Sequence, residues 1–128
     1  MKVLALDYGV ARTGVAVSDA TGTIARPLGV VVRAASEAGL GELVALVREH
    51  EPERIVVGMP LTLRGERGEQ ALETDEFVGA LREAVSVPVE TYDERFTTAL
   101  ASRGGGAADE DARAAAHLLE SYLRSVSA

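Results

Sequence analysis

Apolar residues in the first quarter of the chain fall into three short runs separated by turn signals. The run from Val3 to Tyr8 ends in Asp7-Tyr8-Gly9, which predicts a buried strand followed by a turn. Thr13 to Asp19 and Leu28 to Val32 are rich in small and β-branched residues, which predicts a second and a third strand. Short turns join the three runs, so we expect them to form an antiparallel meander.

The pattern changes to a helical period after the third run. Leucine and valine recur every three or four positions between Ser36 and His50, which predicts an amphipathic helix with Ser36 as its cap. Glu69 to Val85 predicts a second helix, whose apolar face is expected to consist of Leu72, Val78, Leu81 and Val85.

Two further helices are predicted near the end of the chain. A short helix is expected from Arg95 to Arg103, ended by the glycine triplet at positions 104–106. Asp109 to Ser125 is rich in alanine and leucine, which are strong helix formers, and it predicts the last helix.

Two more strands complete the pattern. Arg54 to Met59 contains a continuous apolar run that is typical of a strand covered on both faces. Val87 to Tyr92 predicts the fifth strand, and Pro88 indicates an edge strand or a strand beginning. The order βββαβαβα plus a C-terminal helix predicts an α/β fold, a mixed five-stranded sheet flanked by helices. We expect residues 1–128 to form a single domain.

Composition excludes several classes of protein. The 128 residues include 47% hydrophobic residues but no cysteine, so a core is available while disulfides and thiolate metal sites are not. No apolar stretch is long enough to cross a bilayer, and we expect a cytoplasmic protein that does not bind membranes. The net charge of −7 argues against a nucleic-acid partner, although bound divalent cations would offset part of it.

Acidic residues stand at positions where the predicted fold would bring them together. Asp7 ends the first strand, and Asp93 and Glu94 follow the last one. If these strands are parallel, their carboxyl ends meet at one edge of the sheet. Asp111 shares a helical face with Leu118 and Tyr122, which predicts that it points toward the sheet. The alternative roles are a capped turn for Asp7 and a favourable helix-dipole contact for Asp111.

Such a group of carboxylates has the chemistry of a divalent-metal site. Clustered acids without a basic partner repel one another, and oxygen ligands without cysteine or paired histidine suit Mg²⁺ or Mn²⁺ better than zinc. Two such ions can activate a water molecule and stabilise the leaving oxygen when a phosphodiester is cleaved. The residue types therefore allow a metal-dependent nuclease, although their spacing alone does not require one.

Five segments together resemble the YqgF/RuvX family. In chain order they match the family's opening strand-turn-strand motif, a short motif that follows it, the central strand and loop, the most distinctive signature and the terminal helix. These segments are Asp7 to Asp19, Arg26-Pro27-Leu28, Val56 to Leu61, Asp93 to Thr98 and Asp111 to Leu123. The match extends over nearly the whole chain, in order and at sensible spacings.

The resemblance implies a ribonuclease H-like fold, related to Holliday-junction resolvases, and a nuclease that matures the 5′ end of pre-16S ribosomal RNA. It implies that the metal ligands are Asp7, Asp111 and one acid of the Asp93-Glu94 pair. Glu94 is the first choice, because Asp93 can instead fix the turn by bonding nearby backbone amides. The loop at positions 58–60 carries no acid, which makes the pair the natural substitute for a ligand that related nucleases place there.

The same resemblance implies where the substrate binds. Arg95, Thr97 and Thr98 would lie beside the metals, and Arg12 on the first hairpin would contact the nucleic-acid backbone. Simple capping of the short helix is an equally good role for the two threonines. Two departures from the family pattern, Val10-Ala11 in the first turn and a Gly-rich, Lys-poor loop at positions 104–109, remove phosphate contacts and predict weaker substrate affinity.

Three other functions share parts of this pattern. A Holliday-junction resolvase acts on branched DNA as a dimer, and the sequence leaves monomer and homodimer open. A non-catalytic RNA-binding or ribosome-assembly factor would have no use for the acids, because buried unpaired carboxylates are unfavourable. ATPases with an actin-like fold need two such domains to form a cleft. The sequence thus favours a nuclease, with RNA as the expected substrate.

Overall fold

The computed structural model describes residues 1–60, 67–94 and 107–127. Its strands and helices follow the predicted order. Along the chain they are β1 (Val3–Asp7), β2 (Arg12–Ser18), β3 (Ala25–Val32), α1 (Glu37–His50), β4 (Arg54–Met59), α2 (Glu69–Ala84), β5 (Val89–Asp93) and α3 (Ala107–Ser127). The short helix predicted from Arg95 to Arg103 lies outside the described residues.

The five strands form one mixed sheet in the order β3-β2-β1-β4-β5. β1, β2 and β3 pair antiparallel, which confirms the predicted meander. β4 pairs in parallel with β1 on one side and with β5 on the other. Consequently β1, β4 and β5 all end at the same edge of the sheet. The predicted convergence of the acidic residues depends on this arrangement.

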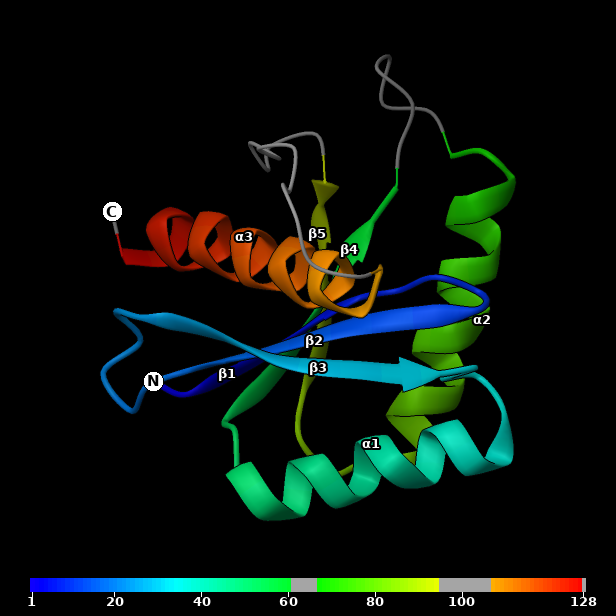
Figure 1. Ribbon diagram of the computed structural model, residues 1–128, viewed down its shortest axis with the longest axis horizontal. Coiled ribbons are helices and arrows are strands. Elements are labelled where there is room, and N and C mark those ends of the chain that lie inside the picture. Colours follow the sequence, from blue (N-terminus) through cyan, green and yellow to red (C-terminus); the bar gives the residue numbers. More distant parts are fainter. Residues whose placement is uncertain (61–66, 95–106, 128) are drawn as a thin grey trace.

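The helices cover both faces of the sheet, α1 and α2 on one and α3 on the other (Figure 1). Alternation along β1 divides the core accordingly. Leu4 and Leu6 pack with Leu43 of α1 and Phe77 of α2. Val3 and Ala5 face α3, and β4 sends residues to both sides, as its continuous apolar run predicted.

Element boundaries differ from the predictions where proline or tertiary packing decides them. β3 begins at Ala25 instead of Leu28, and it accommodates Pro27 because it is an edge strand. β5 begins after Pro88, at Val89, and is the other edge. The Ser36 cap is confirmed, since its hydroxyl accepts a 3.0 Å hydrogen bond from the Gly39 amide.

One predicted packing face is wrong. Leu72 was expected to face the core from the second helix, but it is 57% exposed. Leu72 lies six residues before Val78. At 3.6 residues per turn this separation is about 1.7 turns, so the two side chains point in directions about 120° apart around α2. The buried face instead includes Ala71, Thr74, Phe77, Val78 and Leu81. Among the described helices, none combines the length and apolar character needed to cross a membrane.

Candidate active site

The ends of β1 and β5 bring Asp7 and Glu94 together across the intervening strand. Asp7 is the last residue of β1, and Glu94 directly follows β5. Between them, β4 carries Gly58, and a Cβ at this position would overlap the Glu94 carboxylate. The Glu94 side chain therefore crosses over Gly58 and forms a hydrogen bond with Asp7. The convergence predicted for parallel strands is confirmed for these two acids.

A second glycine allows Asp111 to approach Asp7. Gly14 of β2 is the partner of Asp7 in the antiparallel β1–β2 pairing. α3 passes so close to Gly14 that a Cβ there would overlap the main-chain carbonyl of Asp111. The approach brings Asp111 close enough for its charge to raise the pKa of Asp7, in agreement with the prediction that Asp111 points toward the sheet.

Polar contacts hold the far half of α3 against the strands that lead to the site. The Tyr122 hydroxyl accepts a 2.6 Å hydrogen bond from Arg54 of β4 and donates one of 2.5 Å to Glu90 of β5. One residue earlier on α3, Ser121 shares a 2.8 Å hydrogen bond with the Tyr92 hydroxyl. Because Tyr92 lies two residues before Glu94, these contacts fix α3 relative to the strand that supplies the second acid.

Burial changes the protonation of the Asp7–Glu94 pair. Burial is the main reason why the pKa of Glu94 rises to about 8, and the hydrogen bond and the charges of Asp7 and Asp93 raise it further. Burial and the charge of Asp111 also raise the pKa of Asp7, while the hydrogen bond from Glu94 lowers it. Glu94 is therefore the proton donor at neutral pH, and Asp7 is the acceptor.

Asp111 has a basic partner, which the sequence analysis did not foresee. The Nε atom of Arg12 lies 2.8 Å from an Asp111 carboxylate oxygen. The side chains of Arg12 and Asp111 are 51% and 28% exposed, so the pair stabilises the fold by at most about 1 kcal/mol. The sequence analysis expected the clustered carboxylates to have no basic partner, and this expectation is wrong for Asp111.

The carboxylate oxygens of Asp7, Glu94 and Asp111 suit a hard divalent cation, although the three groups are not arranged around a common centre. Asp7 and Glu94 are half-buried carboxyl groups with raised pKa values, and carboxylate oxygens are the ligands that Mg²⁺ and Mn²⁺ prefer. Within the described ranges, no three acidic or histidine side chains are already grouped as a metal site. Asp111 is directed to Arg12 instead, and release of this exposed pair would make its carboxylate available.

The remaining predicted site residues have different outcomes. Asp93 is the last residue of β5, opposite Met59, and its charge contributes to the raised pKa of Glu94. Arg12 lies at the start of β2, on the first hairpin as predicted, and is exposed. Arg95, Thr97 and Thr98 lie outside the described residues.

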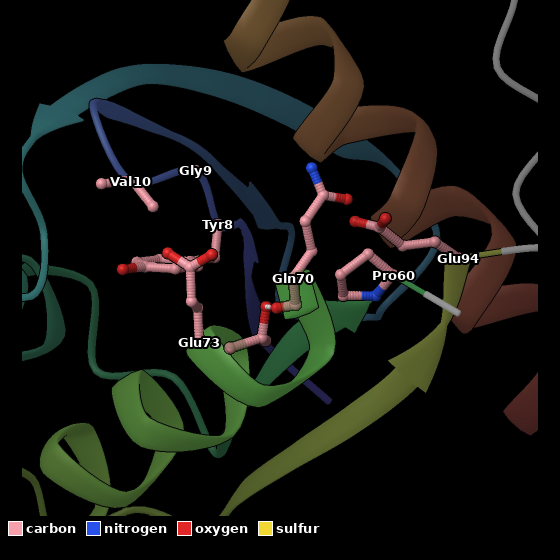
Figure 2. A pocket seen from close by; sticks show the side chains of 8 residues that line it. Tyr8, Gly9, Val10, Pro60, Gln70, Glu73 and Glu94 are labelled. Atoms are coloured by element: carbon pink, nitrogen blue, oxygen red, sulfur yellow. Dashed lines mark hydrogen bonds between the residues drawn. The ribbon is translucent and has the colours of Figure 1, made fainter. Parts of the chain in front are cut away.

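The structure also contains a cavity beside the acids that sequence reasoning missed. It measures about 160 Å³ and lies between the first turn and the beginning of α2. Its wall includes the Glu94 side chain, as Figure 2 shows, and the other lining residues are Tyr8, Gly9, Val10, Pro60, Gln70, Glu73 and Thr74. Several of these residues lie in the segments that resemble the family, but no pattern in the sequence indicates a cavity, because it exists only once α2 packs against the sheet.

The chain is similar to known proteins over nearly its whole length. A family model described as RuvX, Holliday junction resolvase, matches residues 1–125. A protein of Chloroflexus aurantiacus named "Putative pre-16S rRNA nuclease" is 46% identical over 101 residues, 79% of this chain and 66% of that protein. A Syntrophomonas wolfei protein of the same name is 38% identical, with 96% of this chain and 94% of that protein covered.

Among solved structures, the chain is similar to Thermus thermophilus RuvC in complex with a Holliday junction substrate. The match covers 99% of this chain and 96% of the RuvC chain. The TM-score is 0.61 at 20% sequence identity, which is a likeness of fold and confirms the predicted ribonuclease H-like architecture. The sequence match covers every acid discussed above, from Asp7 to Asp111. The chain therefore belongs to the RuvX family.

Proposed function

We propose that residues 1–128 form a cytoplasmic, metal-dependent nuclease domain that hydrolyses phosphodiester bonds in RNA. Its relatives are named for pre-16S rRNA, and we take the 5′ end of that precursor as the natural substrate. The observation that carries the proposal is the half-buried, hydrogen-bonded Asp7–Glu94 pair with Asp111 beside it. Such a pair is unfavourable for folding unless a cation or a substrate uses it.

In this proposal Asp7, Glu94 and Asp111 hold Mg²⁺ or Mn²⁺. When bound, such an ion supplies an activated water molecule and stabilises the charge that develops on the phosphate oxygens. Gly58 and Gly14 have structural roles, because they let Glu94 and α3 reach the position of Asp7. Glu94 would have to be ionised to hold the cation, because a ligating carboxylate must be deprotonated.

Arg12 has two partners in this scheme. Without substrate it neutralises Asp111 through the 2.8 Å ion pair. A substrate phosphate offers the guanidinium a stronger, bidentate partner, and the move would free Asp111 for the metal. Arg95, Thr97 and Thr98 are proposed to contact the substrate beside the metals, and Asp93 is proposed to keep Glu94 in place.

Branched DNA is the second candidate substrate, because the matching family is described as Holliday junction resolvase. Two active sites are needed to cut a four-way junction symmetrically, so this function would require a homodimer, whereas RNA cleavage is compatible with a monomer. The two candidates therefore differ in oligomeric state as well as in substrate.

A cleavage assay with two substrates tests the proposal. End-labelled single-stranded RNA and a four-way DNA junction are incubated with Mg²⁺, Mn²⁺ or EDTA and with wild-type protein, Asp7→Asn or Asp111→Asn. Asp109→Asn is the matched control, since Asp109 is an exposed acid in the same helix turn. We expect RNA cleavage that needs metal, is lost in the first two variants and survives in the control. Cleavage of the junction alone would favour the resolvase, and no cleavage of either would contradict the nuclease.

A further inference from the structure

The cavity beside Glu94 has the size and position of a subsite for part of the substrate. Its volume of about 160 Å³ is well below the roughly 300–1,000 Å³ of pockets that enclose a drug-sized molecule, so it suits a single ring system. Figure 2 shows that Glu94, the acid shared with the proposed metal centre, is part of the wall. A group bound here would be attached to a nucleotide whose phosphate lies at the acids.

One side of the cavity is a fixed aromatic ring. Tyr8 stacks on Phe77 with ring centroids 4.3 Å apart and an interplanar angle of 13°. Phe77 is buried in the core and covers one face of the Tyr8 ring, and Tyr8 also lines the cavity. A rigid, partly exposed aromatic side chain is the kind of surface on which unpaired bases pack in complexes with single-stranded nucleic acids.

Among the described residues, the polar part of the wall is rich in acceptors and includes no positively charged side chain. Gln70 and Glu73 lie on the first turns of α2, and in the described part of the chain neither side chain has a hydrogen-bond or ion-pair partner. The Thr74 hydroxyl already donates to the Gln70 carbonyl at 2.8 Å, which leaves it as an acceptor. The described lining residues include two acids, Glu73 and Glu94, and no lysine or arginine, so this part of the wall favours a neutral ring with N–H donors over a phosphate.

We propose that this cavity binds one unstacked nucleobase next to the cleaved phosphodiester and that Glu73 selects guanine. The proposal rests on the nuclease function and adds to it a preference for sequence. Guanine offers two adjacent donors, N1–H and the N2 amino group, which match the two oxygens of one carboxylate. Uracil, adenine and cytosine each place an acceptor beside their donor on this edge, and the acceptor would face a carboxylate oxygen. Gln70, one turn away, supplies an adaptable second contact.

Binding measured without cleavage tests the selection. The probes are a fluorescently labelled single-stranded oligouridine and the same oligonucleotide with one central guanine, measured in EDTA. The wild-type protein is expected to bind the guanine probe about tenfold more tightly, the usual effect of one bidentate base contact. Glu73→Gln is expected to reduce this ratio to near one, because its amide group places a donor against a guanine donor.

Glu76→Gln is the matched control. It removes the same charge three residues further along α2, and the charges of both Glu73 and Glu76 act on Tyr8, but Glu76 does not line the cavity. The control is expected to keep the guanine preference. Equal binding of the two probes by the wild-type protein, or an unchanged ratio in Glu73→Gln, would overturn the proposal.

Cleavage of the same two probes in Mg²⁺ separates this proposal from the nuclease function. Guanine-selective binding without any cleavage would support the base site and contradict the nuclease. Metal-dependent cleavage without a preference in binding would leave the nuclease in place and overturn the guanine site.

Discussion

Replacing Gly14 with alanine is expected to force α3 away from the active-site edge of the sheet. A Cβ at this position would overlap the main-chain carbonyl of Asp111 and come within 3.1 Å of the Ala112 nitrogen. Both atoms belong to helix backbone, so no side-chain rotation can relieve the contact. The helix must shift, and Asp111 moves with it relative to Asp7, the strand partner of Gly14.

The expected loss of activity is larger than the loss of stability. Overpacking of this kind lowers the free energy of unfolding by about 1–3 kcal/mol. In a domain of this size, each kcal/mol lowers the Tm by roughly 4 °C. A displacement of about 1 Å in a catalytic group lowers the rate by ~100-fold, so the cleavage rate should fall by about that factor even where the protein is fully folded.

Gly41→Ala and Gly79→Ala are matched controls. Both residues lie on exposed helix positions, and a Cβ at either meets nothing within 4 Å. Alanine there is expected to stabilise the protein by about 0.5–1 kcal/mol and to leave cleavage unchanged. Thermal denaturation and single-turnover cleavage of end-labelled RNA in Mg²⁺ give the two readouts. A Gly14→Ala protein that matches Gly41→Ala in both would refute the argument that this close approach positions Asp111.

Three further changes test the electrostatics of the site. Arg12→Ala removes the cation paired with Asp111. Calorimetry should therefore show that Mg²⁺ binds up to about fivefold more tightly and that RNA binds more weakly. Weaker Mg²⁺ binding would contradict the proposal that Arg12 competes with the metal for Asp111. In Gly58→Ala the new Cβ meets the flexible Glu94 side chain first, so the Tm should change little while the affinity for Mg²⁺ falls. A large loss of stability with normal Mg²⁺ affinity would contradict the role given to Gly58. The folded protein keeps a proton on Glu94 that the unfolded chain releases near pH 4.5, so without metal the free energy of unfolding should decrease as the pH rises from about 4.5 to 8. Urea titrations across this range should show that decrease, and Glu94→Gln should make it smaller, because only the raised pKa of Asp7 then contributes.

The sequence was most informative about elements and about residues at their ends. Periodicity and continuous apolar runs identified each described strand and helix to within a few residues, because each element buries at least one of its faces. Asp7 and the Asp93-Glu94 pair were predicted to meet at one edge if their strands are parallel, and β1, β4 and β5 do pair in parallel. Leu72 shows the weakness of the method, since a leucine in an amphipathic segment need not lie on the buried face.

The contacts that complete the site depend on tertiary structure and left no local signal. Arg12 and Asp111 are 99 positions apart, and no periodicity connects them. The loop at Gly58 was interpreted only as the absence of an acid, whereas the missing side chain is what lets Glu94 reach Asp7. The role of Gly14 is similar, because the backbone of a helix remote in sequence decides it.

The central claim is that Asp7, Glu94 and Asp111 together hold a divalent cation. A Mn²⁺ titration followed by electron paramagnetic resonance tests it directly, with the wild-type protein, Asp7→Asn, Glu94→Gln, Asp111→Asn and the exposed control Asp109→Asn. We predict stoichiometric binding by the wild-type protein and the control, and a loss of affinity of at least tenfold in each of the other three. Wild-type affinity in any of these three variants would contradict the assignment of that acid, and wild-type affinity in all three would contradict the site.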